Sequence, residues 1–152
     1  MSVNTKMFGE IEIEKEKIIT FDKGLIGLPN LKKFALITDL EAKDSKIQWL
    51  QSLDEPSMTL PVINPYEILN EYNPVVEDEL LNSLGEFKEE DLMLMVTIRV
   101  PEDITQMSIN LKGPIVINVE TKKGCQIIVE DDMQVRFPVY DILKEKKEKG
   151  GK

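Results

Sequence analysis

Carboxylates are the most plentiful side chains in this chain that could perform chemistry. They gather in four short runs, at residues 77–79, 89–91, 102–103 and 130–132. Two converging carboxylates could hydrolyse a glycosidic bond, and several carboxylate oxygens could bind a hard cation. No run has the pattern of a calcium-binding loop, and aromatic residues make up only 6% of the chain, which is few for a sugar-binding cleft. We therefore interpret the runs as solvated acidic surface and keep a carboxylate hydrolase or a divalent-cation-binding domain as the alternative.

Other reactive groups are scarce. Histidine is absent, so the usual general base, the catalytic triads and the commonest metal ligand are missing. Cys125 is the single cysteine, which excludes an intramolecular disulfide, and no neighbour in the sequence would activate its thiol. The "GLIG" of residues 24–27 lacks the lysine and the strand–loop–helix frame of a phosphate-binding loop. These residues predict no catalytic site, cofactor or metal, and they favour a binding or structural role.

The charge favours proteins over nucleic acids as partners. The chain carries a net charge of −9, with a pI near 4.7. The last nine residues, "KEKKEKGGK", hold five lysines and two glutamates, or +3, so the body before them carries −9 − 3 = −12. Nucleic-acid binding needs clustered Lys and Arg that displace counterions, whereas an acidic surface attracts basic proteins. We expect a basic protein partner and no direct contact with nucleic acid.

Length and hydropathy indicate one domain without a membrane segment. The 152 residues suit a single core, which we place at residues 1–143, before a charged tail at residues 144–152 that we expect to be disordered. The N-terminal segment lacks the apolar stretch of a signal peptide, and the longest apolar run, "LMLMV", is too short to span a bilayer. We therefore expect a cytoplasmic protein with no membrane partner.

Short apolar runs separated by turn residues predict a mainly β fold. We expect a small antiparallel sheet that curls or closes into a barrel, with one or two short helices. Residues 91–100 are apolar on both faces and should lie centrally, whereas Pro61 should confine residues 58–64 to an edge or a bulge. Further strands are expected at residues 11–13, 18–19, 34–38, 107–112, 114–120, 125–130 and 133–139.

Two further features predict local structure. The acidic start and the leucine spacing of residues 77–84 indicate a helix. The "TKKG" of residues 121–124 is typical of a hairpin loop, in which we expect Gly124 to take a left-handed conformation.

The segment "FDKGLIGLPNLKKF", residues 21–34, is apolar and interrupted by glycines. Gly24 and Gly27 should take backbone conformations that other residues resist. Phe21 and Leu28 should anchor the segment in the barrel core. Its other apolar residues either fold back into the core or stay exposed for a partner. We adopt the second interpretation and expect Leu25 and Ile26 to be partly exposed beside the acidic surface, as the apolar centre of a protein contact.

Nearly the whole chain resembles the flagellar assembly factor family, FliW. The opening "TKMFGEIEIEKEKIITFDKGLIGLPNLKKFALI" is similar to the family's T-K-x-F-G start and its I-x-F-P-x-G-L-P-G-F motif. The stretch "VPEDITQMSINLKGPIVINVETKKGCQIIVEDD" resembles its V-P-E-D, N-L-x-x-P-I-V-I-N and K-G-x-Q motifs, and "QVRFPV" resembles its terminal Y-x-x-R-x-P. Residues 41–90 carry no such motif, so the resemblance constrains this part of the chain only weakly. Asp22 and Ile26 stand where the family has prolines, Leu28 where it has an aromatic residue, and Phe137 where it has a histidine.

The resemblance implies a regulator that performs no catalysis. Members of the family bind flagellin in the cytoplasm, and they also bind the carbon storage regulator CsrA, a small basic RNA-binding protein that represses flagellin translation. The two partners compete, so export of flagellin frees the factor to take the repressor. A third interpretation, a structural subunit that self-associates through a large apolar patch, stays open. The candidate partner-binding residues are Leu25, Ile26, Glu77, Asp78, Glu79, Glu102 and Asp103.

Overall fold

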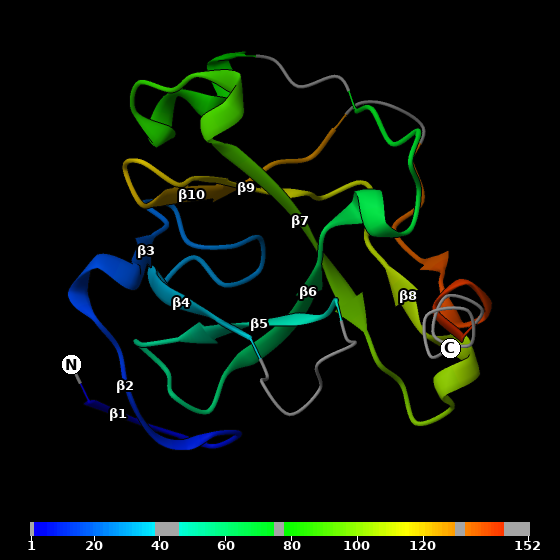
Figure 1. The fold of residues 1–152 in the computed structure, drawn as a ribbon, viewed down its shortest axis with the longest axis horizontal. Helices are drawn as coiled ribbons and strands as arrows, with labels where there is room; N and C mark the ends of the chain where they lie inside the picture. The colour runs from blue at the N-terminus through cyan, green and yellow to red at the C-terminus, as the bar shows by residue number, and fades with distance from the viewer. Residues whose placement is uncertain (1, 39–45, 75–77, 130–132, 145–152) are drawn as a thin grey trace.

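The computed structural model describes residues 2–38, 46–74, 78–129 and 133–144, and seven strands close into a barrel (Figure 1). This confirms the mainly β barrel expected from the sequence. β10 (Lys123–Gln126) pairs with β3 (Ile18–Thr20) in parallel, through Lys123 and Thr20, whereas the other ring neighbours are antiparallel. The two strands come from distant parts of the chain, so no hairpin dictates their direction. The ring order is β3 (Ile18–Thr20), β4 (Lys33–Thr38), β5 (Gln48–Ser52), β6 (Thr59–Ile63), β7 (Leu92–Arg99), β9 (Ile115–Asn118) and β10 (Lys123–Gln126).

Smaller elements surround the barrel. β1 (Ser2–Thr5) and β2 (Gly9–Glu12) form a separate hairpin, while β8 (Ser108–Ile109) and β11 (Phe137–Pro138) extend the sheet beyond β7. Residues 140–144 form a last turn of α-helix. The described chain also contains the 3-10 helices η1 (Lys15–Lys17), η2 (Pro65–Glu67), η3 (Asp78–Leu84), η4 (Glu89–Asp91) and η5 (Ile104–Gln106).

Some sequence predictions fall wholly or partly outside the described residues. The helix expected at residues 77–84 is the 3-10 helix η3, and Glu77 itself lies just before the described part. The acidic run at residues 130–132 and the tail at residues 145–152 are not described either. The predicted disorder of the tail therefore stays a prediction.

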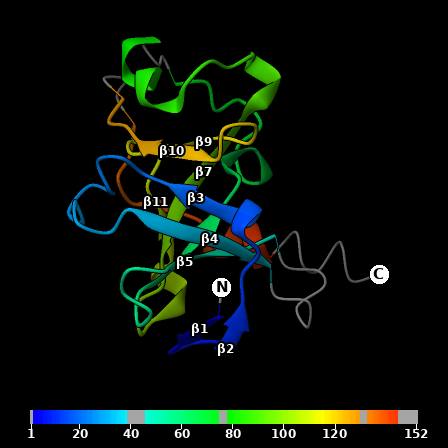
Figure 2. The ribbon, with the colours of Figure 1, turned by 90° about the vertical axis from the view of Figure 1, so that its left-hand side faces the viewer.

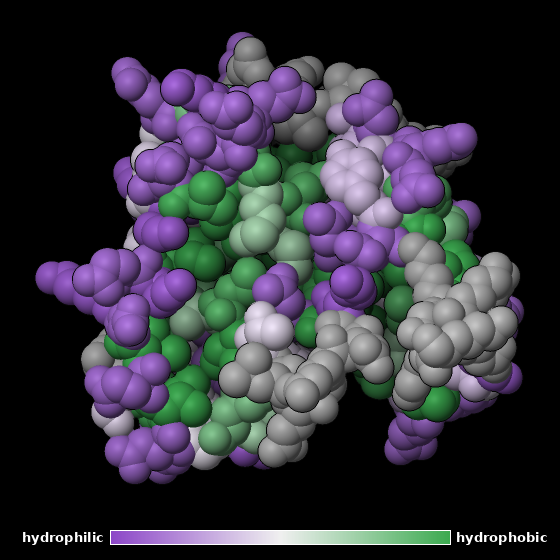
Figure 3. Space-filling view, in the orientation of Figure 1, coloured by the Kyte–Doolittle hydropathy of each residue, from purple (hydrophilic) through white to green (hydrophobic). Residues whose placement is uncertain are grey.

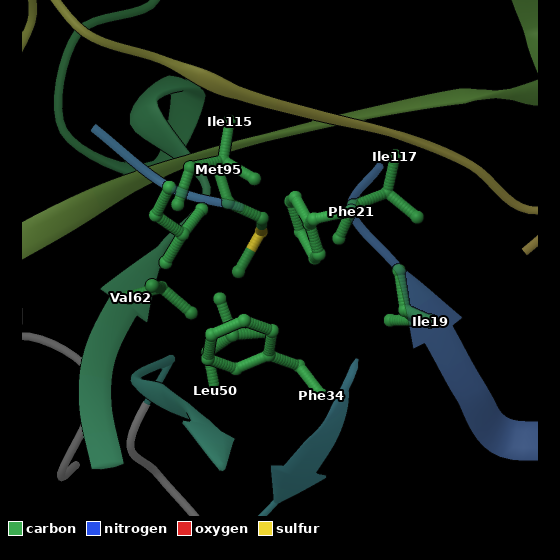
Figure 4. Packing of buried hydrophobic residues seen from close by; sticks show 9 residues of the cluster. Ile19, Phe21, Phe34, Leu50, Val62, Met95, Ile115 and Ile117 are labelled. Carbon is green, nitrogen blue, oxygen red and sulfur yellow. The ribbon is translucent and has the colours of Figure 1, made fainter. Parts of the chain in front are cut away.

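The barrel interior holds the main hydrophobic core (Figure 4). The rings of Phe21 and Phe34 meet edge-to-face, with centroids 5.3 Å apart, and both side chains are fully buried. Leu50, Met95 and Ile115 complete the centre of the cluster. Burying a large apolar side chain stabilises a protein by about 1.5–3 kcal/mol, so this cluster dominates the stability of the ring.

The position of one strand differs from the prediction. β7 is central as expected, because it pairs with β6, β8 and β9. β6 lies between β5 and β7, and its register with β5 runs without interruption from Thr59 to Val62, so the edge position expected for residues 58–64 is wrong and the ladder to β5 contains no bulge. Pro61 lies opposite Trp49 of β5, and the ladder to β7 begins only at Val62. The missing N–H of Pro61 therefore removes no bond from the β6–β7 ladder.

Gly124 is required for space rather than for a left-handed backbone. The predicted hairpin forms, but its loop spans residues 119–122, and Lys123 and Gly124 already pair with β9. The residue with positive φ is Lys122, at 59°, so the left-handed conformation predicted for Gly124 is wrong. A Cβ on Gly124 would lie 2.6 Å from Cζ of Phe21. The ring of Phe21 thus fills the space that a side chain on β10 would otherwise take, and this contact joins the two strands that close the barrel.

We expect Gly124→Ala to destabilise the protein. At an ordinary φ this change stabilises by about 0.4–1 kcal/mol through the unfolded state, but the new methyl group meets the Phe21 ring, and overpacking of this kind costs about 1–3 kcal/mol. Urea titration gives the free energy of unfolding. Because the clash is with the ring, adding Phe21→Leu should cost less in this variant than in the parent. An alanine variant as stable as the parent would contradict the steric role of Gly124.

Candidate functional site

A tight turn displays Ile26 at its corner. Leu25 and Leu28 exchange backbone hydrogen bonds, with the Leu28 N–H donating at 2.8 Å and the Leu25 N–H at 3.2 Å. Ile26 and Gly27 therefore form the corner of a two-residue turn. Gly27 has φ +84°, the value that the second corner position of a type II turn requires and that glycine reaches without strain. The first corner position of this turn type favours proline, and this chain has Ile26 there.

The turn buries one leucine and exposes the isoleucine beside it. Leu25 is 4% exposed, so the partial exposure expected for it is wrong. Partners in an antiparallel bridge point to the same side, so Leu25 and Leu28 both face the barrel core, where Leu28 is half-buried. The corner points the other way, and Ile26 is 53% exposed, as expected.

The base of the segment is fixed by close backbone packing. Gly24 has φ +66°, and a Cβ there would lie 2.5 Å from the backbone oxygen of Leu28. The Gly24 N–H donates to the Phe21 carbonyl at 2.9 Å, and the Phe21 side chain is fully buried. The burial of Phe21 confirms its expected role as an anchor. The positive φ of Gly24 and Gly27 confirms that both take backbone conformations that other residues resist. The segment joins β3 to β4 and extends past the strands, in blue at the left of Figure 2.

Gln126 connects this turn to the barrel. Its Oε1 accepts a hydrogen bond of 2.9 Å from the Ile26 N–H, and its Nε2 donates one of 2.9 Å to the Gly113 carbonyl. Ile128 is 52% exposed, two residues further along the same extended segment, whereas Ile127 and Val129 are buried. Because alternate residues of an extended chain share a face, Ile128 lies on the side of Gln126 and Ile26. The sequence predictions omitted both Gln126 and Ile128, although the K-G-x-Q motif and the alternation of "CQIIVE" were the signals that could have found them.

The acidic candidates form two separate groups. Glu79 is exposed on η3, the helix that also contains Asp78. Glu102 and Asp103 are exposed in the loop between β7 and β8. Figures 1 and 2 both place η3 and the β7–β8 loop at opposite ends of the molecule. The fold therefore does not bring the predicted carboxylates together into one acidic surface.

The loop between β7 and β8 combines acidic and apolar groups. Asp103 Oδ1 accepts hydrogen bonds from the Thr105 backbone N–H at 3.1 Å and from the Thr105 hydroxyl at 2.6 Å. These bonds begin η5 and fix the loop. Val100 and Ile104 are 52% and 51% exposed on either side of the carboxylates. The arrangement can offer an apolar contact with an acidic border.

Neither the described pocket nor Cys125 supplies catalytic equipment. A pocket of about 240 Å³ is lined, among the described residues, by Thr38, Lys46, Gln48, Asn64 and Glu67, and Glu67 is the one carboxylate of that set. The described lining therefore does not supply the paired carboxylates that the hydrolase alternative requires. Burial raises the pKa of the Cys125 thiol, although a hydrogen bond with Ser83 and the charge of Lys23 lower it in part. A raised pKa leaves little of the reactive thiolate at neutral pH.

The described part of the chain offers neither a metal-ligand cluster nor a membrane-spanning helix. Within residues 2–38, 46–74, 78–129 and 133–144, no three Asp, Glu or Cys side chains gather as ligands for a metal ion. No helix in those ranges is long and apolar enough to cross a bilayer. In the face shown in Figure 3, hydrophobic side chains gather at the centre over the barrel, with hydrophilic ones around them. Self-association through an apolar patch stays a prediction.

Comparisons with known proteins agree along nearly the whole chain. The family model described as FliW protein matches residues 2–139. The flagellar assembly factor FliW of Lachnoclostridium phytofermentans is 49% identical over 98% of this chain and 97% of its own. That of Lachnospira eligens is 49% identical over 95% and 97%. The crystal structure of a flagellar assembly factor FliW superposes with a TM-score of 0.83 at 29% identity, covering 92% of this chain and 97% of the other. These matches confirm the resemblance of the motifs, and they show that this chain belongs to the FliW family of flagellar assembly factors.

Proposed function

We propose that this chain is a cytoplasmic, non-catalytic assembly factor that binds flagellin and antagonises the carbon storage regulator CsrA. The two proteins compete for it although they contact separate surfaces, so binding of one lowers the affinity for the other. Flagellin that awaits export therefore occupies the factor, and its export frees the factor to bind the repressor and restore flagellin translation. Membership of the family supports this role, as does a site that offers contacts rather than catalytic groups. The observation that carries the proposal is the exposed Ile26 on a rigid turn.

The Ile26 turn is the flagellin contact. An apolar side chain at the tip of a fixed turn can enter the apolar face of an amphipathic helix, which is the form expected of flagellin's terminal segments. Leu25 supports the turn from beneath and does not touch the partner. Because Leu25, Leu28 and Gly24 fix the base of the turn and its corner is bonded to Gln126, binding loses little conformational entropy at this point.

The carboxylates attract the basic repressor. The body of the chain carries −12 ahead of its Lys-rich end, and Glu79, Glu102 and Asp103 are exposed upon it. Charges of this kind raise the rate of association more than they strengthen the complex once it has formed. The exposed Val100 and Ile104 supply the apolar contact beside Glu102 and Asp103. The factor acts on the repressor protein, and it does not bind the RNA itself.

Ile26→Ala should weaken flagellin binding by about 1 kcal/mol or more and leave the melting midpoint nearly unchanged, because the side chain is 53% exposed. Calorimetric titration with flagellin measures the affinity. Ile104→Ala is the matched control, since Ile104 is 51% exposed at a different site, and it should bind flagellin as the parent does. Leu25→Ala should instead lower stability by roughly 2–5 kcal/mol, as truncation of a buried leucine does. Parental affinity in Ile26→Ala, or an equal loss in Ile104→Ala, would refute this contact.

Association with CsrA should slow as salt is added, because exposed charges are screened over about 8–10 Å at physiological ionic strength. Stopped-flow mixing gives the association rate constant. Replacing Glu79 and Glu102 with glutamine should lower that constant at low salt and change the dissociation rate constant little. Asp103 is left intact because it caps η5. An association rate independent of salt would contradict the steering role, and tight binding of the isolated protein to a repressor-target RNA would contradict the proposed function.

A further inference from the structure

We propose that Gln126 is a positioning residue that holds the Ile26 turn against the barrel in the orientation presented to the partner. The inference rests on the proposed role of Ile26 in flagellin binding. The bond from the Ile26 N–H to Gln126 Oε1, at 2.9 Å, spans 100 residues of chain and ties the corner of the turn to β10.

The far end of the Gln126 side chain is anchored as well. Its Nε2 donates to the Gly113 carbonyl at 2.9 Å. The turn that carries Gly113 is itself fixed, because Asn110 Oδ1 accepts from the N–H groups of Lys112 and Gly113, each at 3.0 Å. One partner requires an acceptor and the other a donor, so the two bonds specify which way the Gln126 amide faces.

The bonds within the turn fix its base and close it, but they do not join its exposed corner to the barrel. The Leu25–Leu28 bridge closes the turn, and the buried side chain of Leu25 anchors the turn in the core. The corner itself, at Ile26 and Gly27, is exposed, and the bond to Gln126 restrains it directly. Without that bond the corner would sample more orientations, and the partner would have to order it on binding. Gln126 therefore acts through Ile26 and need not touch flagellin.

The test is a double-mutant cycle with two readouts. Gln126→Leu keeps the approximate size of the side chain and removes both of its hydrogen bonds. Amide hydrogen exchange at Ile26, followed by NMR on the free protein, reports the bond without any partner. Calorimetric titration with flagellin then compares the parent, Gln126→Leu, Ile26→Ala and the double variant. Gln106→Leu is the matched control, because Gln106 is exposed on η5.

We expect Gln126→Leu to speed exchange at Ile26 and to weaken flagellin binding, each by about two- to tenfold, which is the range for one net hydrogen bond. In the Ile26→Ala background the same change should leave the affinity nearly unaltered, because no isoleucine side chain remains to be positioned. Gln106→Leu should change neither readout.

Unchanged exchange at Ile26 in Gln126→Leu would overturn the inference, and so would affinity losses that simply add in the double variant, since these would mean that Gln126 acts independently of Ile26. Failure of the proposed function gives a different result. If the parent does not bind flagellin, or if Ile26→Ala binds it normally, the proposed flagellin contact is refuted. Amide exchange at Ile26 still decides, in that case, whether Gln126 holds the turn.

Discussion

The packing of the Phe21 ring against the bare backbone of Gly124 is the contact on which this fold depends. β3 and β10 are distant in the chain, and their ladder is a single register pair between Thr20 and Lys123. So short a ladder does little to hold two strands together, and a ring seated where β10 carries no side chain adds the apolar contact that the ladder lacks. The barrel therefore closes through a side chain as much as through backbone pairing.

The same contact places the candidate site. Phe21 begins the segment that reaches the Ile26 corner, and its carbonyl holds Gly24 at the entry to the turn. Gly124 stands two residues before Gln126, whose side chain ties the corner to the barrel. The displayed isoleucine thus lies in the segment that follows β3, and its restraint, Gln126, belongs to β10, so both are attached to the strands that close the ring. A rigid core beneath an exposed apolar tip is an arrangement suited to binding a partner with little loss of conformational entropy.

Local patterns in the sequence were sufficient to predict the parts of the fold that local chemistry determines. The two-sided apolar run placed β7 centrally, and the "TKKG" loop predicted the β9–β10 hairpin. The burial of Leu25 was missed because a two-residue turn sends its flanking residues to one side, and residue type does not reveal where the corner falls. The steric role of Gly124 and the hydrogen bond between Gln126 and Ile26 could not be predicted from local sequence patterns for a different reason. Each depends on two segments, about 100 residues apart in the chain, that the closed barrel brings together.

The central claim is that this factor contacts flagellin through the Ile26 turn, and an amide footprint of the complex tests it most directly. Hydrogen exchange of every amide would be compared between the free protein and the protein saturated with flagellin. We predict slower exchange at residues 25–28 and in the neighbouring segment 126–128, with no change at residues 100–106. Protection confined to residues 100–106, or to the β1–β2 hairpin, with residues 25–28 unaltered, would contradict the claim.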